Sequence, residues 1–445
     1  MKSILTRLAV RPKFATVFAL FTALVFLPVT LANAVEIQTV KSPGGITALL
    51  VEDYTVPLIA VSMAFTGGAT QEAPDKEGLT NILSSLLDEG AGDIKSQDFQ
   101  LKLDELGVEL GFSAGYDSFT GRLKTLRSTR NEAFDMLRLA LTKPRFDLEP
   151  IERMRAAQLS ILQNSLKKPN VIAGKAWRKS VFGDHPYARS VGGTIKAVKG
   201  LNRDDIVSIH KKLLAKDNLV VGVVGAISAK ELAEMLDQVF GDLPDKAELK
   251  PVKEASLAIG GTQKVDLNLP QSIIRVVFNG LKRENKDFYA AYLMNYILGG
   301  GSFSSRLYNE IREKRGLAYG VYTYLGTQDH AGFIGGGTAT RADRADETIK
   351  ILLAEVERMA KDGPTKEELE KAKKYITGSY AISNLDTSGK IASVLVAIQR
   401  EKLGIDYIDK RADYIAAVTI EDTKRMAREL LSTKPTIIIV GPNKS

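Results

Sequence analysis

Apolar and polar residues follow two kinds of spacing along this chain, and both kinds occur early and late. Strict alternation predicts two antiparallel strand pairs: 108–114 with 118–125, and 317–325 with 332–340. Apolar residues three and four apart predict two long helices: 149–166 and 366–383. Strands followed by runs of helices favour an α+β fold with helices packed on one face of a sheet, because a nucleotide-binding α/β fold would alternate more strictly.

The spacing also divides the chain into two halves. The break lies at 244–263, which is rich in Lys, Glu, Ala, Gly and Pro. Late in each half, a helix that begins near an aspartate is followed by an apolar strand, at 204–224 and at 421–440. This recurrence suggests an internal duplication. We therefore expect two homologous domains, 35–243 and 264–445, each an antiparallel or mixed β-sheet covered by helices, joined by the linker 244–263.

Two helices carry additional signals. Thr365 and Glu368 follow Gly363-Pro364 and form the pattern of a capping box at a helix start. A second apolar stripe at helical spacing predicts core packing: Ile391, Val394, Leu395 and Ile398.

The first 34 residues have the pattern of a secretory signal peptide. Four basic residues precede an apolar stretch, and Ala32-Asn33-Ala34 forms a small-x-small cleavage site. We expect cleavage after Ala34 and export, most simply to a bacterial periplasm. The alternative is an uncleaved membrane anchor, which Pro28 and the cleavage triplet disfavour.

Composition limits the other function classes. The formal net charge of +8 falls to about +4 without the four basic residues of the leader, and no basic stripe interleaved with aromatic residues indicates nucleic-acid binding. No membrane association is expected after cleavage. Cysteine is absent, which removes thiolate metal sites and cysteine nucleophiles. A chain of this length can stabilise itself by core burial without disulfides.

A metal site is not visible in the sequence. The three histidines, His185, His210 and His330, are far apart, and none lies in an H-x-x-H or H-x-x-E-H frame. Catalytic zinc usually needs three protein ligands, most often histidines and a carboxylate. We therefore expect no metal bound by this chain.

Arg315 and Tyr322 are the strongest candidates for chemistry. Arg315 ends a predicted helix that Gly316 terminates, and a strand follows. Strand alternation places Ala318 and Gly320 on the face of Tyr322, where they would let another backbone approach, and turns Leu317, Tyr319 and Val321 to the core. A guanidinium and a phenol hydroxyl aimed at one peptide carbonyl can position it and stabilise an oxyanion.

Residue chemistry alone leaves a plainer alternative open. Arg315 could pair with Glu313 or Asp329, and Tyr322 could be a half-buried strand tyrosine. Glu310 could also pair with Arg315 and orient it. Arg306 and Glu310, four residues apart, are expected to form an ion pair.

The block from Gly299-Gly300-Gly301 through Ser304-Ser305-Arg306 to Tyr322 resembles the second-domain signature of the pitrilysin/insulinase zinc peptidases, the family of the mitochondrial processing peptidase. This resemblance implies that Arg315 and Tyr322 hold the substrate backbone. It also implies that the glycine run borders the substrate cavity; the plain alternative is a flexible connector. His185-Pro186-Tyr187 resembles a first-domain segment of the same family, with His185 as a structural hydrogen-bond donor.

The resemblance also shows where zinc ligands are missing. The family's inverted motif H-x-x-E-H would fall on the 81–85 segment, where Asn81, Ser84 and Ser85 replace the two histidines and the glutamate. Its distal zinc-binding glutamate would fall near Ile161. An amide and a hydroxyl bind zinc poorly, and serine cannot act as a general base at neutral pH.

The resemblance therefore implies the zinc-lacking subunit of a two-chain peptidase. A homologous partner would carry zinc and the general base, and unfolded peptides would be the substrates. A scaffold or peptide-binding protein without catalysis is the second hypothesis. Independent activity is the third, but neither G-x-S-x-G nor Ser-x-x-Lys can be placed beside a base.

Overall fold

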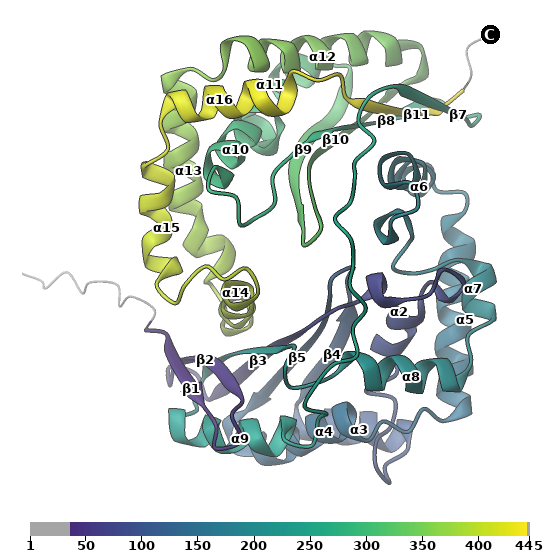
Figure 1. Ribbon diagram of the computed structural model, residues 1–445, viewed down its shortest axis with the longest axis vertical. Coiled ribbons are helices and arrows are strands. Elements are labelled where there is room, and N and C mark those ends of the chain that lie inside the picture. The colour runs from purple at the N-terminus through teal and green to yellow at the C-terminus, as the bar shows by residue number, and fades with distance from the viewer. Residues whose placement is uncertain (1–35, 443–445) are drawn as a thin grey trace, which may run out of the picture. The chain divides into compact units, whose positions relative to one another are not determined.

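The computed structural model describes residues 36–442, so the predicted signal segment lies outside the described residues. Two β-sheets organise the described chain, and each draws its strands from one half of the sequence (Figure 1). The strands of the first sheet are β1 (Gln38–Lys41), β2 (Thr47–Glu52), β3 (Leu58–Thr66), β4 (Glu109–Ala114), β5 (Ser118–Leu126) and β6 (Leu219–Gly225). Their order across the sheet is β1-β2-β6-β3-β5-β4.

The second sheet repeats this topology. Its strands are β7 (Thr262–Asp266), β8 (Gln271–Asn279), β9 (Ala318–Gln328), β10 (Ala331–Arg341) and β11 (Thr436–Gly441), in the order β7-β11-β8-β10-β9. The last strand of each half has one parallel neighbour, β2 for β6 and β7 for β11, whereas the other pairs are antiparallel. The first sheet has one additional strand, β1, beside β2. The predicted fold class and internal duplication are confirmed.

Helices fill most of the remaining chain. In the first half they are α2 (Leu79–Ser84), α3 (Ser96–Leu106), α4 (Arg130–Thr142), α5 (Leu148–Ser165), α6 (Pro169–Phe182), α7 (Ile195–Lys199), α8 (Arg203–Leu213) and α9 (Ala229–Phe240). In the second half they are α10 (Phe288–Asn295), α11 (Arg306–Tyr308), α12 (Ala345–Asp362), α13 (Lys366–Asn384), α14 (Ser388–Arg400), α15 (Tyr407–Ala416) and α16 (Ile420–Leu431). The capping box of Thr365 and Glu368 is confirmed at the start of α13. The same device starts α8, α9 and α16.

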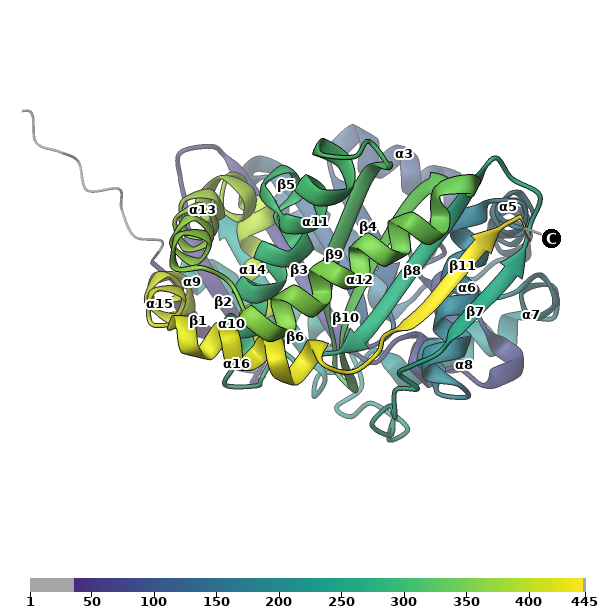
Figure 2. The ribbon, with the colours of Figure 1, turned by 90° about the horizontal axis from the view of Figure 1, so that it is seen from above.

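Each half covers one face of its sheet with its own helices. In the second half, α12 and α16 lie over the sheet, as Figure 2 shows from above. The two main cores follow this division: one packs the first sheet against α2, α3, α4, α8 and α9, and the other packs the second sheet against α10, α12 and α16.

The opposite face of each sheet is covered by a helix from the other half. Helix α6 packs on β8 and β11 of the second sheet, where Ala173, Trp177 and Val181 are buried. Helix α14 packs on β3 and β6 of the first sheet, and Gln399 donates to the Val221 carbonyl at 2.8 Å. The apolar stripe predicted on α14 therefore belongs to a core, but α14 packs on the first sheet and not on the sheet of its own half. Leu395 and Ile398 of this stripe are buried. Because α6 and α14 follow α5 and α13 in the repeated topology, this exchange is reciprocal.

A buried junction ties the hairpin turns of the two sheets together. The Tyr187 hydroxyl donates to Asp117 Oδ2 at 2.7 Å and accepts from the His330 backbone N–H at 3.0 Å. Asp117 lies between β4 and β5, and Asp329 and His330 lie between β9 and β10. The backbone N–H of Asp329 also donates to Asp117 Oδ2. Burial raises the pKa of Asp117, opposed by the hydrogen bond from Tyr187.

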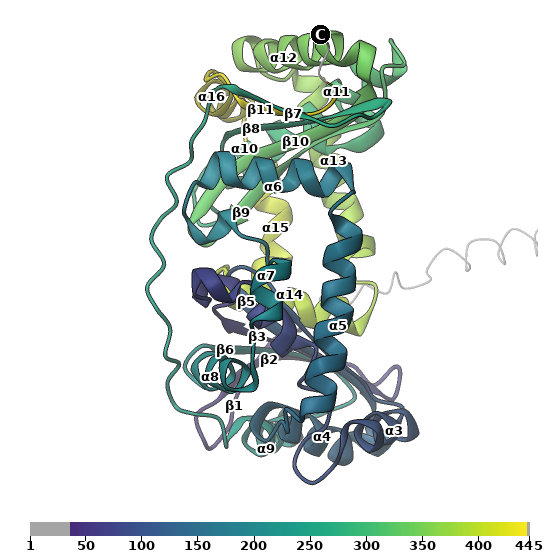
Figure 3. The same ribbon diagram turned by 90° about the vertical axis from the view of Figure 1, so that its right-hand side faces the viewer.

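The segment between α9 and β7 runs along one side of the structure (Figure 3). It touches both halves: Lys216 of the first half donates its N–H to the Pro244 carbonyl, and Ala255 of the segment donates to the His330 carbonyl of the second half. Because α6 and α14 cross between the halves, the boundaries 35–243 and 264–445 remain predictions. Among the helices of residues 36–442, none is long and apolar enough to cross a bilayer.

The helix exchange predicts that valine lowers stability at one strand glycine, Gly222, and has little effect at another, Gly111. A Cβ at Gly222 on β6 would lie 2.5 Å from the Ala392 carbonyl oxygen and 2.7 Å from Leu395 Cβ, both on α14. We expect Gly222→Val to lower the free energy of unfolding by about 2 kcal/mol or more, because the added methyl groups push α14 off the sheet. Urea unfolding of the chain measures this.

Gly111→Val on β4 is the matched control, since a Cβ there meets nothing within 4 Å. It should stay within about 1 kcal/mol of the wild type, because valine suits a strand position. Equal effects of the two substitutions would contradict the close approach of α14 to β6.

Candidate functional site

Arg315 is anchored at the start of strand β9. The helical segment before it runs through α11 and a π-helical turn, η7 (Asn309–Glu313), and ends at Gly316, whose φ of +59° suits a glycine. Arg315 Nη1 donates to Glu310 Oε2 at 2.6 Å and to the Glu310 carbonyl at 2.8 Å. Hydrogen bonds from Lys314 and Arg315 lower the pKa of Glu310 against the effect of its burial. Glu310 therefore orients Arg315, and the alternatives Glu313 and Asp329 are wrong.

The expected ion pair between Arg306 and Glu310 is also wrong. Arg306 is buried and makes two hydrogen bonds to Glu368, Nε to Oε1 at 2.7 Å and Nη2 to Oε2 at 2.6 Å. Glu368 belongs to the capping box of α13, so this pair joins α11 to α13. Spacing within one helix did not reveal a partner 62 residues away.

Tyr322 lies on β9, the edge strand of the second sheet, and is 44% exposed. Its hydroxyl accepts a hydrogen bond from Arg275 Nη1, and Arg275 Nη2 donates to Asn170 Oδ1 at 2.9 Å. Arg275 on β8 and Tyr322 on β9 both lie opposite Gly337 of β10. A Cβ at Gly337 would lie 2.2 Å from Arg275 Nη1, so the glycine opens the path across the strand.

The sequence did not single out Arg275 or Asn170. Arg275 is a charged residue within an alternating strand and reads as an ordinary solvent-facing position. Asn170 comes from α6, the helix exchanged from the first half. Only the pairing of β8, β10 and β9 together with that exchange brings them to Tyr322.

A β-bulge changes the predicted faces of β9. Val321 pairs with Thr338 and Ala318 pairs with Thr340, so two residues of β9 stand opposite Ala339 alone. The bulge reverses the alternation before it: Ala318 is 8% exposed and joins the core, whereas Tyr319 is 87% exposed. The prediction that Ala318 shares the open face is wrong, as is the prediction of a core position for Tyr319. Gly320 is exposed as predicted, and a Cβ there would meet nothing within 4 Å.

The glycine run packs directly behind β9. Gly299 and Gly300 end the π-helical turn η5 (Tyr296–Gly300), and a Cβ at Gly299 would lie 2.5 Å from Thr323 Oγ1. A Cβ at Gly301 would lie 2.9 Å from the Tyr296 ring. These glycines therefore allow close packing against β9 and do not form a plain flexible connector. A border on a substrate cavity remains a prediction for this segment.

Two exposed aromatic side chains, Phe303 and Tyr319, lie near the Arg312 guanidinium, and Tyr319 belongs to the start of β9. Phe303 is 75% exposed, and its ring centroid lies 5.0 Å from that of Tyr308. The Arg312 guanidinium lies 4.8 Å from the Tyr319 ring centroid and 4.9 Å from that of Tyr308. Rings held by a cation in this way form an apolar surface beside a strand edge.

The first-half positions expected for zinc hold no ligand set. Ser84 and Ser85 end α2, and their hydroxyls donate to the backbone carbonyls of Asn81 and Ile82 at 2.8 and 2.9 Å. Ile161 lies on α5 and is 69% exposed. A serine hydroxyl that donates to the backbone is a poor zinc ligand, and an aliphatic side chain has no ligand atom, so these residues do not fit zinc. Over residues 36–442, no group of three or more His, Asp or Glu side chains is placed to hold a metal ion.

The histidines have structural partners. His185 Nδ1 accepts from the Tyr187 N–H at 3.2 Å, which leaves Nε2 to donate to the Lys253 carbonyl at 2.8 Å. The predicted donor role of His185 is confirmed. His210 bonds the Leu141 carbonyl through Nε2, and burial lowers its pKa.

Glu72 is a buried carboxylate that the sequence did not single out. Oε1 accepts from the Thr80 N–H and hydroxyl, both at 2.7 Å, and Oε2 accepts from the Gly78 N–H at 3.0 Å. The carboxylate thus caps the start of α2, whose N-cap residue Gly78 has no side chain. Burial raises the pKa of Glu72 from 4.5 to about 7, although these hydrogen bonds oppose the shift.

Comparison with known proteins places this architecture. Residues 47–195 match the model of insulinase (peptidase family M16), and residues 200–376 match that of the peptidase M16 inactive domain. The chain belongs to peptidase family M16. An uncharacterized zinc protease of Streptomyces coelicolor is 27% identical over 417 residues, covering 90% of this chain and 89% of that protein. A non-peptidase homolog of Helicobacter pylori is 25% identical over 360 residues, covering 80% of this chain and 82% of that protein.

Solved structures agree with this assignment. The peptidase M16 inactive domain from Pseudomonas fluorescens has a TM-score of 0.86 and 25% identity, covering 92% of this chain and 98% of that one. A protease from Helicobacter pylori has a TM-score of 0.83 at 19% identity, covering 92% and 99%, and shares the fold. This M16 chain keeps the family architecture in both halves and lacks the H-x-x-E-H motif.

Glu72 predicts a pH dependence of stability. Its pKa is higher in the folded chain than in the unfolded chain, so the folded state binds more protons between pH 4.5 and about 7. Stability should therefore fall as pH rises through this window, by up to about 3 kcal/mol from this group. Urea unfolding at pH 5 and pH 8 should show a smaller fall for Glu72→Gln than for the wild type.

Glu105→Gln at an exposed position of α3 is the control and should keep the wild-type difference between the two pH values. If Glu72→Gln keeps that difference as well, the buried carboxyl does not titrate in this range.

Proposed function

We propose that this chain is the non-zinc subunit of a heteromeric zinc metallopeptidase and contributes Arg315 and Tyr322 to the hydrolysis of peptides. The observation that carries the proposal is that both side chains lie at the edge strand β9, and each is held by its own charged partner. A homologous partner with the H-x-x-E-H motif would supply zinc, water and general base. In this chain the corresponding positions, Asn81, Ser84, Ser85 and Ile161, provide none of these groups.

Arg315 is suited to bind a peptide carbonyl. Among residues 36–442, Arg315 makes its hydrogen bonds through Nη1 alone, to Glu310, so the other N–H groups of the guanidinium fork can face a substrate. Glu310 is only 13% exposed, which fixes the direction of that fork. A donor fixed before the substrate arrives contributes a few kcal/mol to the stabilisation of a developing oxyanion.

Tyr322 is suited to donate a proton in a hydrogen bond. Its oxygen already accepts from Arg275, so its own O–H can donate to a substrate. The neighbouring Tyr324 ring stacks at 6.3 Å between centroids and limits the rotation of Tyr322. Arg275 and Tyr324 therefore place the hydroxyl without reacting themselves.

The substrate would bind as an extended strand. β9 ends the order of its sheet and pairs with no second strand among residues 36–442, so a peptide backbone could add beside it. The bulge at Tyr319 and Gly320 interrupts that edge between Arg315 and Tyr322. Unfolded peptides fit this mode because a folded protein rarely offers a free strand. Export to a periplasm after cleavage of residues 1–34 is part of the same proposal.

A non-catalytic scaffold or peptide-binding protein is the second candidate. It is supported by the names of relatives, the M16 inactive domain of Pseudomonas fluorescens and the non-peptidase homolog of Helicobacter pylori. A scaffold needs no oriented Arg315 or open Tyr322, which is why we place it second.

The decisive experiment is peptide hydrolysis with added zinc by this chain alone, by an H-x-x-E-H homologue alone, and by the two mixed. We expect activity in the mixture well above that of either chain. Arg315→Ala or Tyr322→Phe should lower the turnover of the mixture about a hundredfold, because each removes one donor. Unchanged turnover with both variants, or no complex between the chains, would favour the scaffold.

Arg275 should act as a positioning residue for Tyr322. Arg275→Met keeps most of the unbranched stem of the side chain but removes its donors, so we expect turnover of the mixture to fall about tenfold through misplacement of the hydroxyl. Gly337→Ala should act in the same direction, because its Cβ would displace Arg275.

Arg341→Met, at the exposed end of β10, is the matched control and should leave turnover unchanged. Wild-type turnover in Arg275→Met would show that Tyr322 needs no partner on β8.

A further inference from the structure

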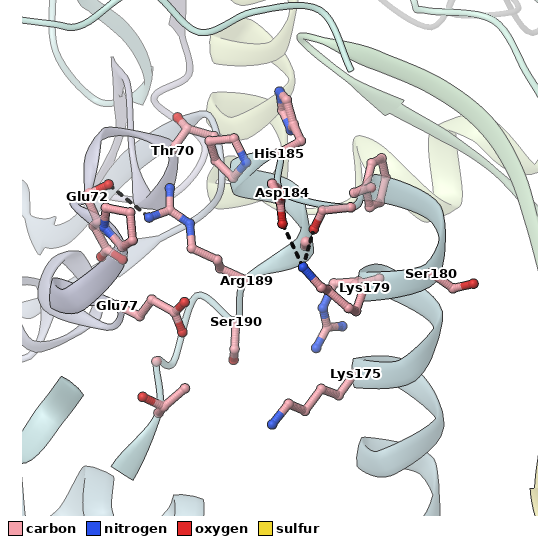
Figure 4. Close-up of a pocket in the computed structure, with 18 of the residues that line it drawn as sticks. Thr70, Glu72, Glu77, Lys175, Lys179, Ser180, Asp184, His185, Arg189 and Ser190 are labelled. Atoms are coloured by element: carbon pink, nitrogen blue, oxygen red, sulfur yellow. Dashed lines mark hydrogen bonds and ion pairs between the residues drawn. The ribbon is translucent and has the colours of Figure 1, made fainter. Parts of the chain in front are cut away.

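A cavity of about 1750 Å³ lies beside α6, and neither Arg315 nor Tyr322 lines it. One wall is α6, and the opposite wall is formed by residues 70–77 and the loop 184–195. The end of α5, the linker residues 250–256 and strand β7 complete the lining. Figure 4 shows Lys175 and Lys179 on successive turns of α6, with Glu72, Glu77 and Arg189 across from them.

Positive charge dominates this cavity. Six cationic side chains line it: Lys175, Arg178, Lys179, Arg189, Lys250 and Lys253. The four anionic residues in the lining are Glu72, Glu77, Asp184 and Glu254. Asp184 is paired with Lys179, and Glu254 is paired with Lys282 from outside the lining. Burial raises the pKa of Glu72 to about 7, so this carboxyl carries only part of its negative charge near neutral pH.

One of the cations has an unmet hydrogen-bonding group. Arg178 Nε is fully buried and has no hydrogen-bond partner among the described residues. Such a donor on a charged group destabilises the fold unless an acceptor reaches it. Because Nε is not exposed, an anionic ligand in the cavity would contact the other atoms of Arg178, which lines the cavity. Arg189 differs, because its Nη1 donates to the Glu72 carbonyl at 3.0 Å.

Apolar side chains form the rest of the lining. Leu166 at the end of α5 is 62% exposed, and Val171 at the start of α6 is 41% exposed. Leu162 and Ile172 on the same two helices and Val252 of the linker extend this apolar part. Its occupant must therefore carry hydrophobic groups as well as negative charge.

We propose that this cavity binds an acidic peptide segment that also carries apolar side chains. Its volume exceeds the 300–1,000 Å³ usual for small-molecule sites, so it can accept several residues. A concave site of mixed apolar and cationic lining suits neither a flat lipid surface nor a stacked base, since aromatic platforms are not prominent in it.

The cavity is connected to the strand edge through α6. Val171 of the lining follows Asn170, which holds Arg275 and thereby Tyr322. Arg178 of the lining lies close enough to Tyr324 to lower its pKa, against the larger raising effect of burial. A peptide added to β9 could thus place its acidic portion in the cavity. The inference deepens the proposed function by naming acidic peptides as substrates. Their hydrolysis rests on the proposed function, whereas their binding to the cavity does not.

The test is direct binding by this chain alone, without residues 1–34, measured by fluorescence anisotropy. The probes are labelled twelve-residue peptides of alternating Glu and Leu, and of alternating Lys and Leu. We expect the acidic peptide to bind at least tenfold more tightly than the basic one. Lys175→Glu with Lys253→Glu should weaken acidic binding at least tenfold, and Arg178→Gln should weaken it severalfold without lowering the thermal stability of the chain.

Lys102→Glu with Lys361→Glu is the matched control, because both residues are exposed, lie outside the cavity and change the net charge equally. Its affinity should equal that of the wild type. Equal loss in the two double variants, or equal affinity for the two peptides, overturns the inference. Hydrolysis by the mixture without preference for acidic peptides would overturn it while leaving the proposed function intact. Binding of the acidic peptide without hydrolysis by any mixture would overturn the proposed function and leave this inference intact.

Discussion

The structure depends on one constraint: a sheet with two apolar faces must be covered on both. Each half provides helices for one face only, so the other face would remain in water. The reciprocal exchange of α6 and α14 meets this need, and Gly222 shows how closely, since a single methyl group would meet the backbone of α14. Burial of apolar area is the main favourable contribution to folding, so the exchange makes each half depend on the other.

The same exchange supplies the candidate site. Asn170 comes from α6 and reaches Arg275 of the second sheet, and Arg275 holds Tyr322. Arg315 is held separately by Glu310, within its own half. The side chains that could bind a peptide are thus placed by two independent sets of contacts. Only the contacts that hold Tyr322 cross between the halves. Tyr322 therefore depends on the fold of the whole chain, whereas Arg315 depends on a local helix end.

The sequence predicted the elements better than their partners. Alternation and helical spacing gave the strand pairs and the long helices, because those patterns arise from local geometry. The pairing of Arg306 with Glu368 and the burial of Ala318 were missed, because the first depends on a distant helix and the second on a bulge that the strand itself does not signal. The missing zinc ligands at Asn81, Ser84, Ser85 and Ile161 followed from the resemblance to the family's zinc motif, which places the ligand positions on these residues. The cavity beside α6 could not be predicted, since its cations come from two segments far apart in sequence, 175–189 and 250–253.

The position of α14 near the end of the chain has a consequence for synthesis. Strands β3 and β6 are made well before residues 388–400, so one face of the first sheet lacks α14 from the completion of β6 until those residues are made. During that interval, exposed apolar strands are prone to pair with other chains or to be held by chaperones. A ribosome that stalls between β6 and α14 would therefore release a product with one sheet face bare, however complete its first half.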